Sequence, residues 1–529
     1  MEERKGFGSN FGFLMAAVGS AVGLGNIWGF PNKMGASGGF TFLIIYLILA
    51  VLCGFIVMVG ELAIGRKTGH GAVGAYKALS KKFKWMGWLG ILSAFFILFF
   101  YCALGGYCIK YTVLNIGDLF GAGFGSNGLS GGEIFGNFLG SPAEGVIYGL
   151  IFVALTMLIV MGGIGGGIEK VCSVGMPALF VALLICIIRA CTLEGTDVAV
   201  QILQADGSLV EGVVNGSALD GLKYMFSPGW AANVGYYVPA KAVVDGAEVS
   251  SIMVNGVAQA IVAYKSGAPS IFNVVSTAGG QMFFSLSLGM GAMITYGSYL
   301  HKKENLQKNA ILIIVMDTLV ALMAGLCVIP GRFALDPDGT LGGPKLLFIT
   351  MQNVFDSMEG AIGPIFGIIF YLLVVLAAVS SSISLLETVV AHFVDEAREK
   401  GKGDQRKKYS FIASILIGLL CVLVSADGLG ANGMAPCDIL NISGDAIRTW
   451  NDCWLDFFDM ISEGVFMPLG GLLMTLMIGW ELGPDIVKNE CEQSGHAMGS
   501  YGFFKICVKF ITPLCMILIL YGQIKEFFF

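Results

Sequence analysis

The stretch AAVGSAVGLGNIWGFP at residues 16–31 decides how this chain can fold. It lies inside an apolar run long enough to cross a bilayer, yet helix-weakening and polar residues interrupt its middle: Gly19, Gly23, Gly25, Asn26 and Gly29. A glycine weakens a helix by roughly 1 kcal/mol relative to alanine, and unpaired backbone groups are costly in hydrocarbon. A helix broken here is stable only if an ion or a polar substrate takes up the freed carbonyls and amides. The stretch therefore predicts a binding site built from backbone groups inside a membrane.

The composition of the whole chain is typical of a multi-pass membrane protein. Of its 529 residues, 56% are hydrophobic and 13% are charged, against roughly 25% charged residues in soluble proteins. The mean hydropathy is +0.78, and the formal net charge of −6 gives no sign of nucleic-acid binding. The first apolar run is too long and too rich in glycine for a cleavable signal peptide. The thirteen cysteines form no metal-type CxxC pair.

Apolar windows of about 20 residues predict about eleven membrane-spanning helices. The windows lie near residues 11–34, 40–65, 86–114, 145–162, 168–191, 271–300, 306–330, 362–394, 409–426, 456–480 and 499–524. Lysine and arginine gather before the first window and in the loops after the second, sixth and eighth, which the positive-inside rule places in the cytoplasm. We therefore expect a plasma or inner cell membrane protein with a cytoplasmic N-terminus and an extracytoplasmic C-terminus.

The longest loop, residues 192–270, differs from the rest of the chain. Two β-prone runs flank Asp206-Gly207, and residues 234–264 show the same pattern of β-prone runs around a turn. This pattern predicts a small β-containing insertion outside the membrane. A disordered loop is the alternative, against which the valines and isoleucines argue. Cys437 and Cys453 share a later extracytoplasmic loop, where a disulfide or two free thiols are both compatible with the sequence.

A second interrupted span, QMFFSLSLGMGAMITYGSY at residues 281–299, contains Ser285, Ser287, Gly289 and Gly291 in its middle. This span is the sixth apolar window, and the break at residues 16–31 lies in the first window. We therefore expect an all-α membrane protein with two inverted five-helix halves and a site between the two breaks. Glycine-rich packing would explain either break alone. The expected organisation is residues 1–191 for helices 1–5, 192–270 for the insertion, 271–481 for helices 6–10 and 482–529 for helix 11.

Four motifs resemble those of the neurotransmitter:sodium symporter family, and the likeness covers nearly the whole chain outside loop 192–270. They are GSAVGLGNIWGFP at 19–31, GELAIGR at 60–66, FFSLSLGMGAMITYGSY at 283–299 and AAVSSSISLLE at 377–387. The resemblance implies the LeuT-type fold and sodium-coupled import of an amino acid by alternating access, without enzymatic chemistry or an organic cofactor. Its partners are then an amino acid, sodium ions and the bilayer, with no nucleic acid. The oligomeric state is left open, a monomer included.

The resemblance further implies two sodium sites and a substrate site. One sodium site would use Ala21, Asn26, Ser285 and Asp317, and the other Gly19, Val22, Ala377, Ser380 and Ser381. The substrate site would be lined by Ala21, Gly23, Gly25, Ile97, Tyr101, Phe284, Ser287, Met290, Ser381 and Leu385. Taken alone, the serines also suit helix packing, Asn26 an interhelical hydrogen bond, and Tyr101 an ordinary buried aromatic position.

Some positions depart from the family's pattern or specify it further. Amine-transporting relatives have aspartate where this chain has Gly23, so a ligand with its own carboxylate is favoured, and the flexible Gly289-Met290-Gly291 segment suits a large aliphatic or aromatic side chain. Gly29 replaces the usual gating arginine and leaves its acidic partner Asp459 without that cation. Asp459 is then either a hydrated residue or a contact for a cationic substrate such as lysine.

Asp317 lies where chloride-dependent relatives have asparagine, and the resemblance places it beside Tyr46, Gln281 and Ser285 in the position equivalent to a chloride site. A fixed carboxylate there predicts transport that needs no chloride.

At the cytoplasmic end, the resemblance implies an inner gate of Arg4, Ser298, Tyr299 and Asp395. Taken alone, Arg4 is also explained as one of the cytoplasmic positive charges that set the membrane topology. Glu61 is expected to hydrogen-bond the unwound part of the sixth span. A sodium and amino-acid sensor that does not transport remains the alternative function, and no HExxH, GxSxG or GxxxxGK[ST] motif supports an enzyme.

Overall fold

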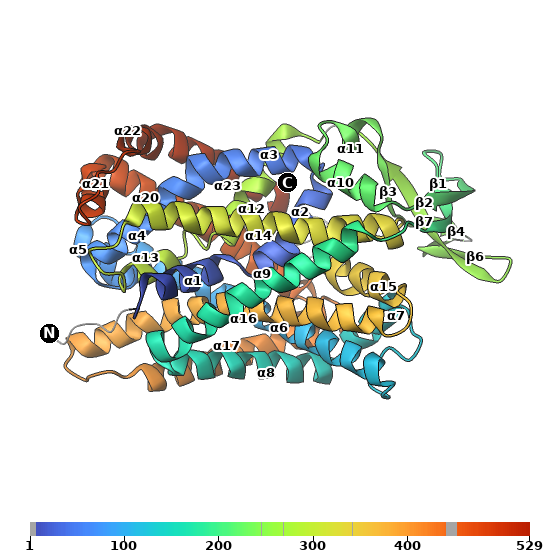
Figure 1. Ribbon diagram of the computed structural model, residues 1–529, viewed down its shortest axis with the longest axis horizontal. Coiled ribbons are helices and arrows are strands. Elements are labelled where there is room, and N and C mark those ends of the chain that lie inside the picture. The colour runs from blue at the N-terminus through green and yellow to red at the C-terminus, as the bar shows by residue number, and fades with distance from the viewer. Residues whose placement is uncertain (1–6, 245, 268, 341, 441–451, 529) are drawn as a thin grey trace.

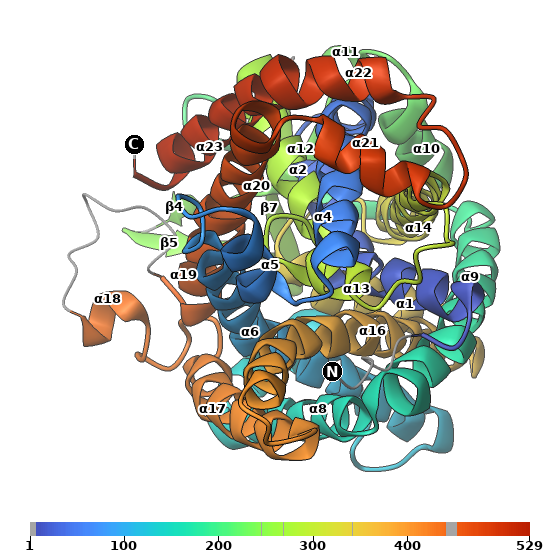
Figure 2. The same ribbon diagram turned by 90° about the vertical axis from the view of Figure 1, so that its left-hand side faces the viewer.

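Long helices run side by side through the molecule, and a small β-sheet projects from one end (Figure 1). The structure, a computed structural model, describes residues 7–244, 246–267, 269–340, 342–440 and 452–528. Viewed from the end opposite the sheet, the helices pack around a central group that contains α1, α4, α12 and α13 (Figure 2).

Nine of the predicted windows coincide with helices long and apolar enough to span a bilayer among the described residues. Five of these spans are single helices: α6 (Met86–Phe120), α8 (Pro142–Met161), α14 (Leu306–Leu335), α16 (Ile362–Glu399) and α17 (Arg406–Asp427). Two others join α3 (Phe40–Leu49), η2 (Ala50–Gly54) and α4 (Phe55–Thr68), and η3 (Ile164–Ile168) and α9 (Glu169–Cys191). The last two join α19 (Trp454–Asp459), η6 (Met460–Phe466), α20 (Met467–Leu476) and η7 (Met477–Leu482), and α22 (Tyr501–Ile506), η8 (Cys507–Ile511) and α23 (Thr512–Phe528). Shorter helices connect them: α5 (Ala72–Leu79), α7 (Gly131–Leu139), η4 (Leu346–Thr350), α15 (Met351–Asp356), α18 (Pro436–Ile439) and α21 (Asp485–Glu492).

The first window forms a broken span. Helix α1 (Asn10–Ala21) ends at the glycine-rich stretch, and η1 (Gly25–Gly29) with α2 (Phe30–Ala36) continues at an angle of 45°. Val22 has extended backbone angles, and its N–H still donates to the carbonyl of Val18. The next carbonyls of α1 therefore lie at a helix C-terminus inside the bundle, where they need other partners.

The sixth window is also interrupted, by residues 286–291 between α12 (Ile271–Ser285) and α13 (Ala292–Gly297). Ser287, Gly289 and Gly291 adopt left-handed backbone angles, with φ of +54°, +79° and +77°. Glycine takes this conformation without strain, whereas serine does so uncommonly. The break is therefore a defined turn between two half-helices.

The predicted β-containing insertion is confirmed and sits at the far end of the bundle (Figure 1). Its elements are β1 (Asp197–Leu203), β2 (Leu209–Asn215), α10 (Ala218–Phe226), α11 (Trp230–Asn233), β3 (Tyr236–Pro239), β4 (Ala242–Val244), β5 (Ala247–Val249), β6 (Ser251–Val254) and β7 (Val257–Lys265). The main sheet has the order β2-β1-β7-β3 with β6 also on β7, while β4 and β5 pair separately. The β1–β2 hairpin turns at Asp206-Gly207 as expected, and a second turn at Asn255-Gly256, with φ of +50° and +82°, joins β6 to β7.

Hydrogen bonds attach this insertion to the bundle. Arg332, buried near the end of α14, donates to the carbonyl of Tyr237 at 2.7 Å. Tyr224 of α10 donates to the carbonyl of Gly35 at 2.5 Å, at the end of α2. The insertion therefore contacts α2, the second half of the first broken span.

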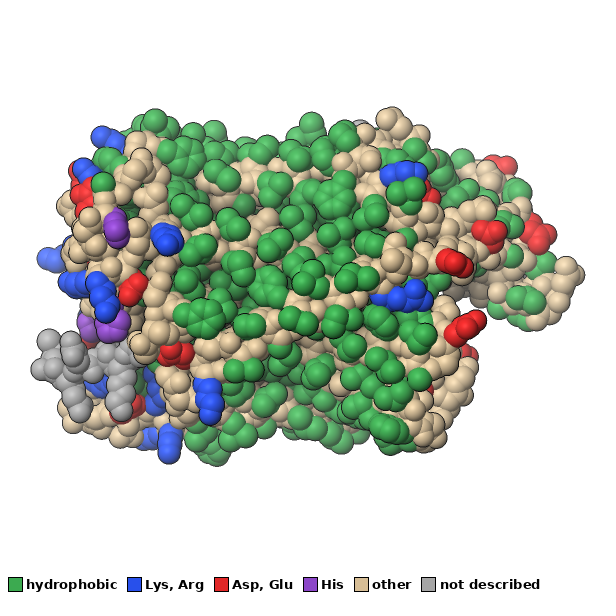
Figure 3. All heavy atoms as spheres, viewed as in Figure 1, with side chains coloured by type: hydrophobic (Ala, Val, Ile, Leu, Met, Phe, Trp, Pro, Cys, Tyr) green, Lys and Arg blue, Asp and Glu red, His purple; other side chains and the backbone are tan. Residues whose placement is uncertain are grey.

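The surface separates into an apolar belt and two polar ends (Figure 3). Lysine and arginine gather at the end where the N-terminus lies, and acidic side chains gather around the sheet at the other end (Figure 3). An apolar belt around a bundle of spanning helices is what a bilayer requires.

Candidate functional site

A small cavity lies between the two broken spans. All ten residues expected at the substrate site line it, together with Ser20, which the sequence reasoning missed. They come from the first broken span, from α6, from the end of α12 and the break after it, and from the middle of α16. The fold therefore brings these distant positions together, and their role in substrate binding stays a prediction.

Tyr101 and Gly23 contact each other at one wall of this cavity. The Tyr101 hydroxyl accepts a hydrogen bond from the N–H of Leu24 at 2.9 Å, which leaves its own hydrogen to donate. A Cβ atom added at Gly23 would overlap the Tyr101 and Ser381 hydroxyls, and one at Gly25 would lie 2.8 Å from the Phe284 ring. Both glycines are thus required by the close approach of α6, α12 and α16 to the first break.

The five groups expected at one sodium site meet behind this wall. Ser380 Oγ lies 2.9 Å from the carbonyl oxygen of Ala377 and 3.2 Å from that of Val22. Ser381 Oγ lies 3.2 Å from each of three carbonyl oxygens, those of Gly19, Ser20 and Val22. Because Ser287 also donates to the carbonyl of Ser20, three hydroxyl hydrogens face four carbonyl oxygens, so acceptors still outnumber hydroxyl donors in a buried place. Such an oxygen-only set suits a hard monovalent cation and fits sodium.

The second expected sodium group surrounds the carboxylate of Asp317. Ser285 Oγ donates to it, at 3.0 and 2.9 Å from its two oxygens, and Tyr46 donates at 3.3 Å. Asn26 presents its amide nitrogen at 2.8 Å to Asp317 and its oxygen to the N–H of Gly23 at 3.0 Å. For Asn26 to ligate a cation beside Asp317, this amide must turn so that its oxygen faces the carboxylate.

Gln281 lies beside this cluster and faces the first break. Its amide nitrogen donates to the carbonyl of Gly25 at 2.6 Å, while its oxygen has no partner among the described residues. A Cβ at Gly29 would lie 2.9 Å from that oxygen. Gln281 therefore occupies the space where a longer side chain at position 29 would begin.

The break after α12 is held from two sides. The buried carboxylate of Glu61 accepts from the N–H of Gly289 at 2.7 Å, which confirms the expected contact with the unwound segment. Ser287 Oγ donates to the carbonyl of Ser20 at 2.8 Å. The two breaks are thus connected directly, across 267 positions of sequence.

The outer end of the site contains a cation that sequence reasoning missed. Lys33, one turn beyond Gly29, pairs with Glu463, one turn beyond Asp459, and the charge of Lys33 also acts on Asp459. The expectation that Asp459 lacks a neighbouring cation is therefore wrong. The sequence signal was available, because Lys33 and Glu463 each lie four residues beyond the family's gating positions.

The inner end has a network of its own. Tyr299 donates to the buried carboxylate of Glu387 at 2.5 Å, and Arg406 pairs with the same carboxylate. Ser298 donates to the carbonyl of Thr295 at 2.6 Å, and Asp395 accepts from the N–H of Gly71 at 3.0 Å. Arg4, the remaining member of the expected inner gate, lies outside the described residues. Glu387 was missed, although an acidic residue inside an apolar helix is itself a functional signal.

The disulfide between Cys437 and Cys453 is not formed, since both thiols are free in the structure. Cys453 instead precedes α19 directly, and its sulfur accepts from the N–H of Asp456 at 3.4 Å. A sulfur that caps a helix in a buried position is already engaged.

Comparison with known proteins agrees with this geometry. A family model described as the sodium:neurotransmitter symporter family matches residues 4–119 and 246–528. The chain is 30% identical to the uncharacterized sodium-dependent transporter YhdH of Bacillus subtilis, over 97% of this chain and 96% of that protein. It is 26% identical to an uncharacterized sodium-dependent transporter of Haemophilus influenzae, over 98% of both chains. A crystal structure of MhsT in complex with L-phenylalanine matches with 30% identity and a TM-score of 0.76, over 98% of this chain and 100% of that one.

The family match covers most of the chain, and the structural match extends over nearly all of it. The family model leaves residues 120–245 unmatched, a range that contains the spanning helices α8 and α9 as well as the β1–β2 hairpin. The chain belongs to the sodium:neurotransmitter symporter family, as a multi-pass, sodium-dependent membrane transporter with the LeuT-type fold and not an enzyme.

Proposed function

We propose that this protein imports an amino acid together with sodium, by alternating exposure of the cavity between the broken spans. The observation that carries the proposal is the surplus of carbonyl oxygens around Ser380 and Ser381. Buried carbonyl acceptors that outnumber their hydroxyl donors favour a bound cation, and these acceptors adjoin the lining of the cavity. Ion and substrate would therefore stabilise the same closed arrangement of the helices, which is what coupling requires.

A second sodium ion is proposed beside Asp317. Its carboxylate, the Ser285 hydroxyl and the Asn26 amide oxygen after rotation would supply oxygens, with the Ala21 carbonyl and the substrate carboxylate on the cavity side. Because Asp317 brings a fixed negative charge into a buried place, no chloride ion is needed to balance the sodium. Transport is therefore expected to be independent of chloride.

The proposed substrate is a neutral amino acid with a large aliphatic or aromatic side chain. Tyr101 has a hydroxyl hydrogen for the substrate carboxylate, while Ile97, Phe284 and Met290 give the cavity apolar walls. The solved relative MhsT was crystallised with L-phenylalanine, which supports this class. A lysine-like substrate is less favoured, because Lys33 already occupies the acidic outer end.

The proposed orientation follows from charge. The basic loops and the N-terminus share one end of the bundle, which we place in the cytoplasm, and the sheet insertion lies at the opposite end (Figure 3). The C-terminal helix starts at the basic end and packs along α12 toward the insertion, where Gln523 donates to the carbonyl of Ser276 at 3.1 Å.

A thermal-shift screen of the twenty amino acids, with sodium or with choline, tests the substrate assignment. We expect phenylalanine, tryptophan, leucine or a similar amino acid to raise the unfolding temperature only in sodium. Stabilisation by lysine alone would contradict the neutral assignment. Binding without counterflow in proteoliposomes would instead identify a sensor.

A further inference from the structure

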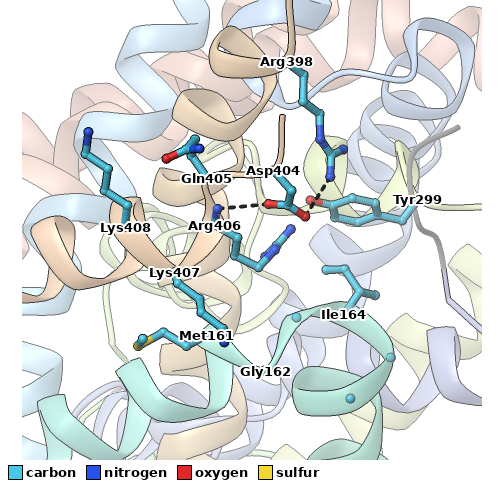
Figure 4. Close-up of a pocket in the computed structure, with 13 residues that line it drawn as sticks. Met161, Gly162, Ile164, Tyr299, Arg398, Asp404, Gln405, Arg406, Lys407 and Lys408 are labelled. Carbon is cyan, nitrogen blue, oxygen red and sulfur yellow. Dashed lines mark hydrogen bonds and ion pairs between the residues drawn. The ribbon is translucent and has the colours of Figure 1, made fainter. Parts of the chain in front are cut away.

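A cavity of about 740 Å³ opens at the basic end of the molecule, and its lining contains no residue of the two proposed sodium sites. Figure 4 shows the residues that line it. Its lining comes from the end of α8 and the start of η3 (residues 161–166), from Tyr299 and Arg398, and from the loop and first turn of α17 (residues 404–408). Of its lining residues, Tyr299 and Arg406 also belong to the inner-end network described above. The cavity therefore needs an explanation of its own.

Four cationic side chains line this cavity: Arg398, Arg406, Lys407 and Lys408. Two of them have acidic partners, because Arg398 donates to Asp404 at 3.1 Å and Arg406 pairs with Glu387. For the ammonium groups of Lys407 and Lys408, no acceptor is found in the part of the chain that the structure describes. With Asp404 as the one acidic lining residue, the cavity keeps a surplus of positive charge.

Backbone amides add to this positive surplus. The 28-residue helix of η3 and α9 begins at Ile164, so the N–H groups of its first turn lack helical acceptors, and Ile164, Gly165 and Gly166 of this turn line the cavity. A Cβ at Gly166 would meet nothing within 4 Å, and one at Gly165 only Glu169 at 3.9 Å. Packing within the protein thus does not require glycine at these two positions. A ligand that approaches the backbone amides closely would require residues without a side chain there. The Glu169 carboxylate is already engaged by the N–H of Gly8 at 2.9 Å.

The cavity lies at the edge of the apolar belt. Directly after Lys408, α17 exposes Phe411, Ile412 and Ile415, each with 44 to 51% of its surface accessible. On α8, Leu158 is 63% exposed one turn before Gly162. An amphiphile bound here would place its polar group in the cavity and its chains along these apolar side chains.

We propose that this cavity binds the phosphate group of an anionic phospholipid headgroup. Basic pockets between helix ends on the cytoplasmic side are the type of site that binds such headgroups. A helix N-terminus lined with glycines supplies the directional N–H donors that phosphate oxygens accept. This inference does not depend on the amino acid that the protein transports.

The test measures the unfolding temperature of the full-length protein in detergent during titration with phosphatidylglycerol, phosphatidylcholine or inorganic phosphate at constant ionic strength. We expect phosphatidylglycerol to stabilise the wild type and phosphatidylcholine to have much less effect. In the double variant K407Q/K408Q the half-saturating phosphatidylglycerol concentration should rise about 10- to 30-fold, since each lysine near an anionic lipid contributes on the order of 1 kcal/mol.

Matched controls separate a built site from general surface charge. K302Q/K303Q removes two exposed lysines from the same end of the molecule, outside the cavity, and should leave the titration unchanged. Gly166→Leu keeps every charge but covers the amides, and it should weaken phosphatidylglycerol binding without lowering the unfolding temperature in plain detergent.

Equal losses in K407Q/K408Q and K302Q/K303Q would overturn the proposal. So would stabilisation by inorganic phosphate without any by phosphatidylglycerol, which would identify a soluble anion as the ligand.

Discussion

Two oxygen clusters flank the break in the first span, and they differ in charge. The cluster around Asp317 contains a full negative charge and three donors, from Asn26, Ser285 and Tyr46. The cluster around Ser381 is neutral and has more carbonyl acceptors than hydroxyl donors. The first is satisfied by its own donors, whereas the second has hydrogen-bonding capacity that a cation would use. This difference predicts that the two sites respond to different perturbations.

The largest effect is expected at the neutral cluster. The double variant S380A/S381A removes both hydroxyl oxygens, and sodium-dependent uptake should fall by at least about 100-fold, since even supporting groups of a metal site cost 10- to 100-fold. Uptake of radiolabelled phenylalanine against sodium concentration measures this.

Ser382→Ala is the matched control on the same helix, because the Ser382 hydroxyl pairs with Thr156 and the carbonyl of Val379 and is remote from the cluster's carbonyls. An equal loss in this variant would show that helix packing, not ion ligation, explains the serines.

At the charged cluster, a smaller and ion-specific effect is expected. Asp317→Asn keeps the shape of the side chain but removes the fixed negative charge. A sodium ion there then lacks the negative charge that neutralises it. Uptake by this variant should depend on chloride and fall about tenfold when gluconate replaces it, which corresponds to about 1.4 kcal/mol. If the variant takes up substrate equally well in gluconate and in chloride, the carboxylate of Asp317 does not replace a chloride ion.

The Lys33–Glu463 pair lies beyond both clusters and should leave ion affinity unchanged. Lys33→Glu places like charges together and should lower the uptake rate about three- to tenfold, because one partly exposed pair contributes on the order of 1 kcal/mol. The reciprocal variant K33E/E463K should recover most of the rate.

Glu144→Gln provides the control, because it breaks the more exposed Lys110–Glu144 pair and should have no effect. A changed sodium dependence in K33E/E463K would contradict the separation between this pair and the clusters.

Much of the fold could be predicted from the sequence, because hydrocarbon leaves few ways to satisfy a backbone. The breaks at residues 16–31 and 281–299 combine glycine with polar residues inside long apolar windows, and both are breaks in the structure. The ten expected cavity residues were identified through resemblance to the family, and the structure brings them together. The Asp206-Gly207 hairpin followed from turn chemistry alone.

Side-chain pairing was harder to predict, because it depends on how helices face one another. Lys33 and Glu463 are 430 positions apart, so their proximity required the helix packing to be known. Glu387 joins Tyr299 and Arg406 from three separate segments. The sequence left open whether Cys437 and Cys453 form a disulfide, because a shared loop indicates the same side of a membrane but not that two sulfurs approach; both thiols are free in the structure.

Uptake of phenylalanine into proteoliposomes under an inward ion gradient tests the central claim most directly. The external salt would be sodium chloride, sodium gluconate or choline chloride, with the purified wild-type protein in otherwise identical vesicles. The account predicts equal accumulation in the two sodium salts and none above background in choline chloride. Accumulation in choline chloride, or its loss in sodium gluconate, would contradict a sodium-coupled, chloride-independent mechanism.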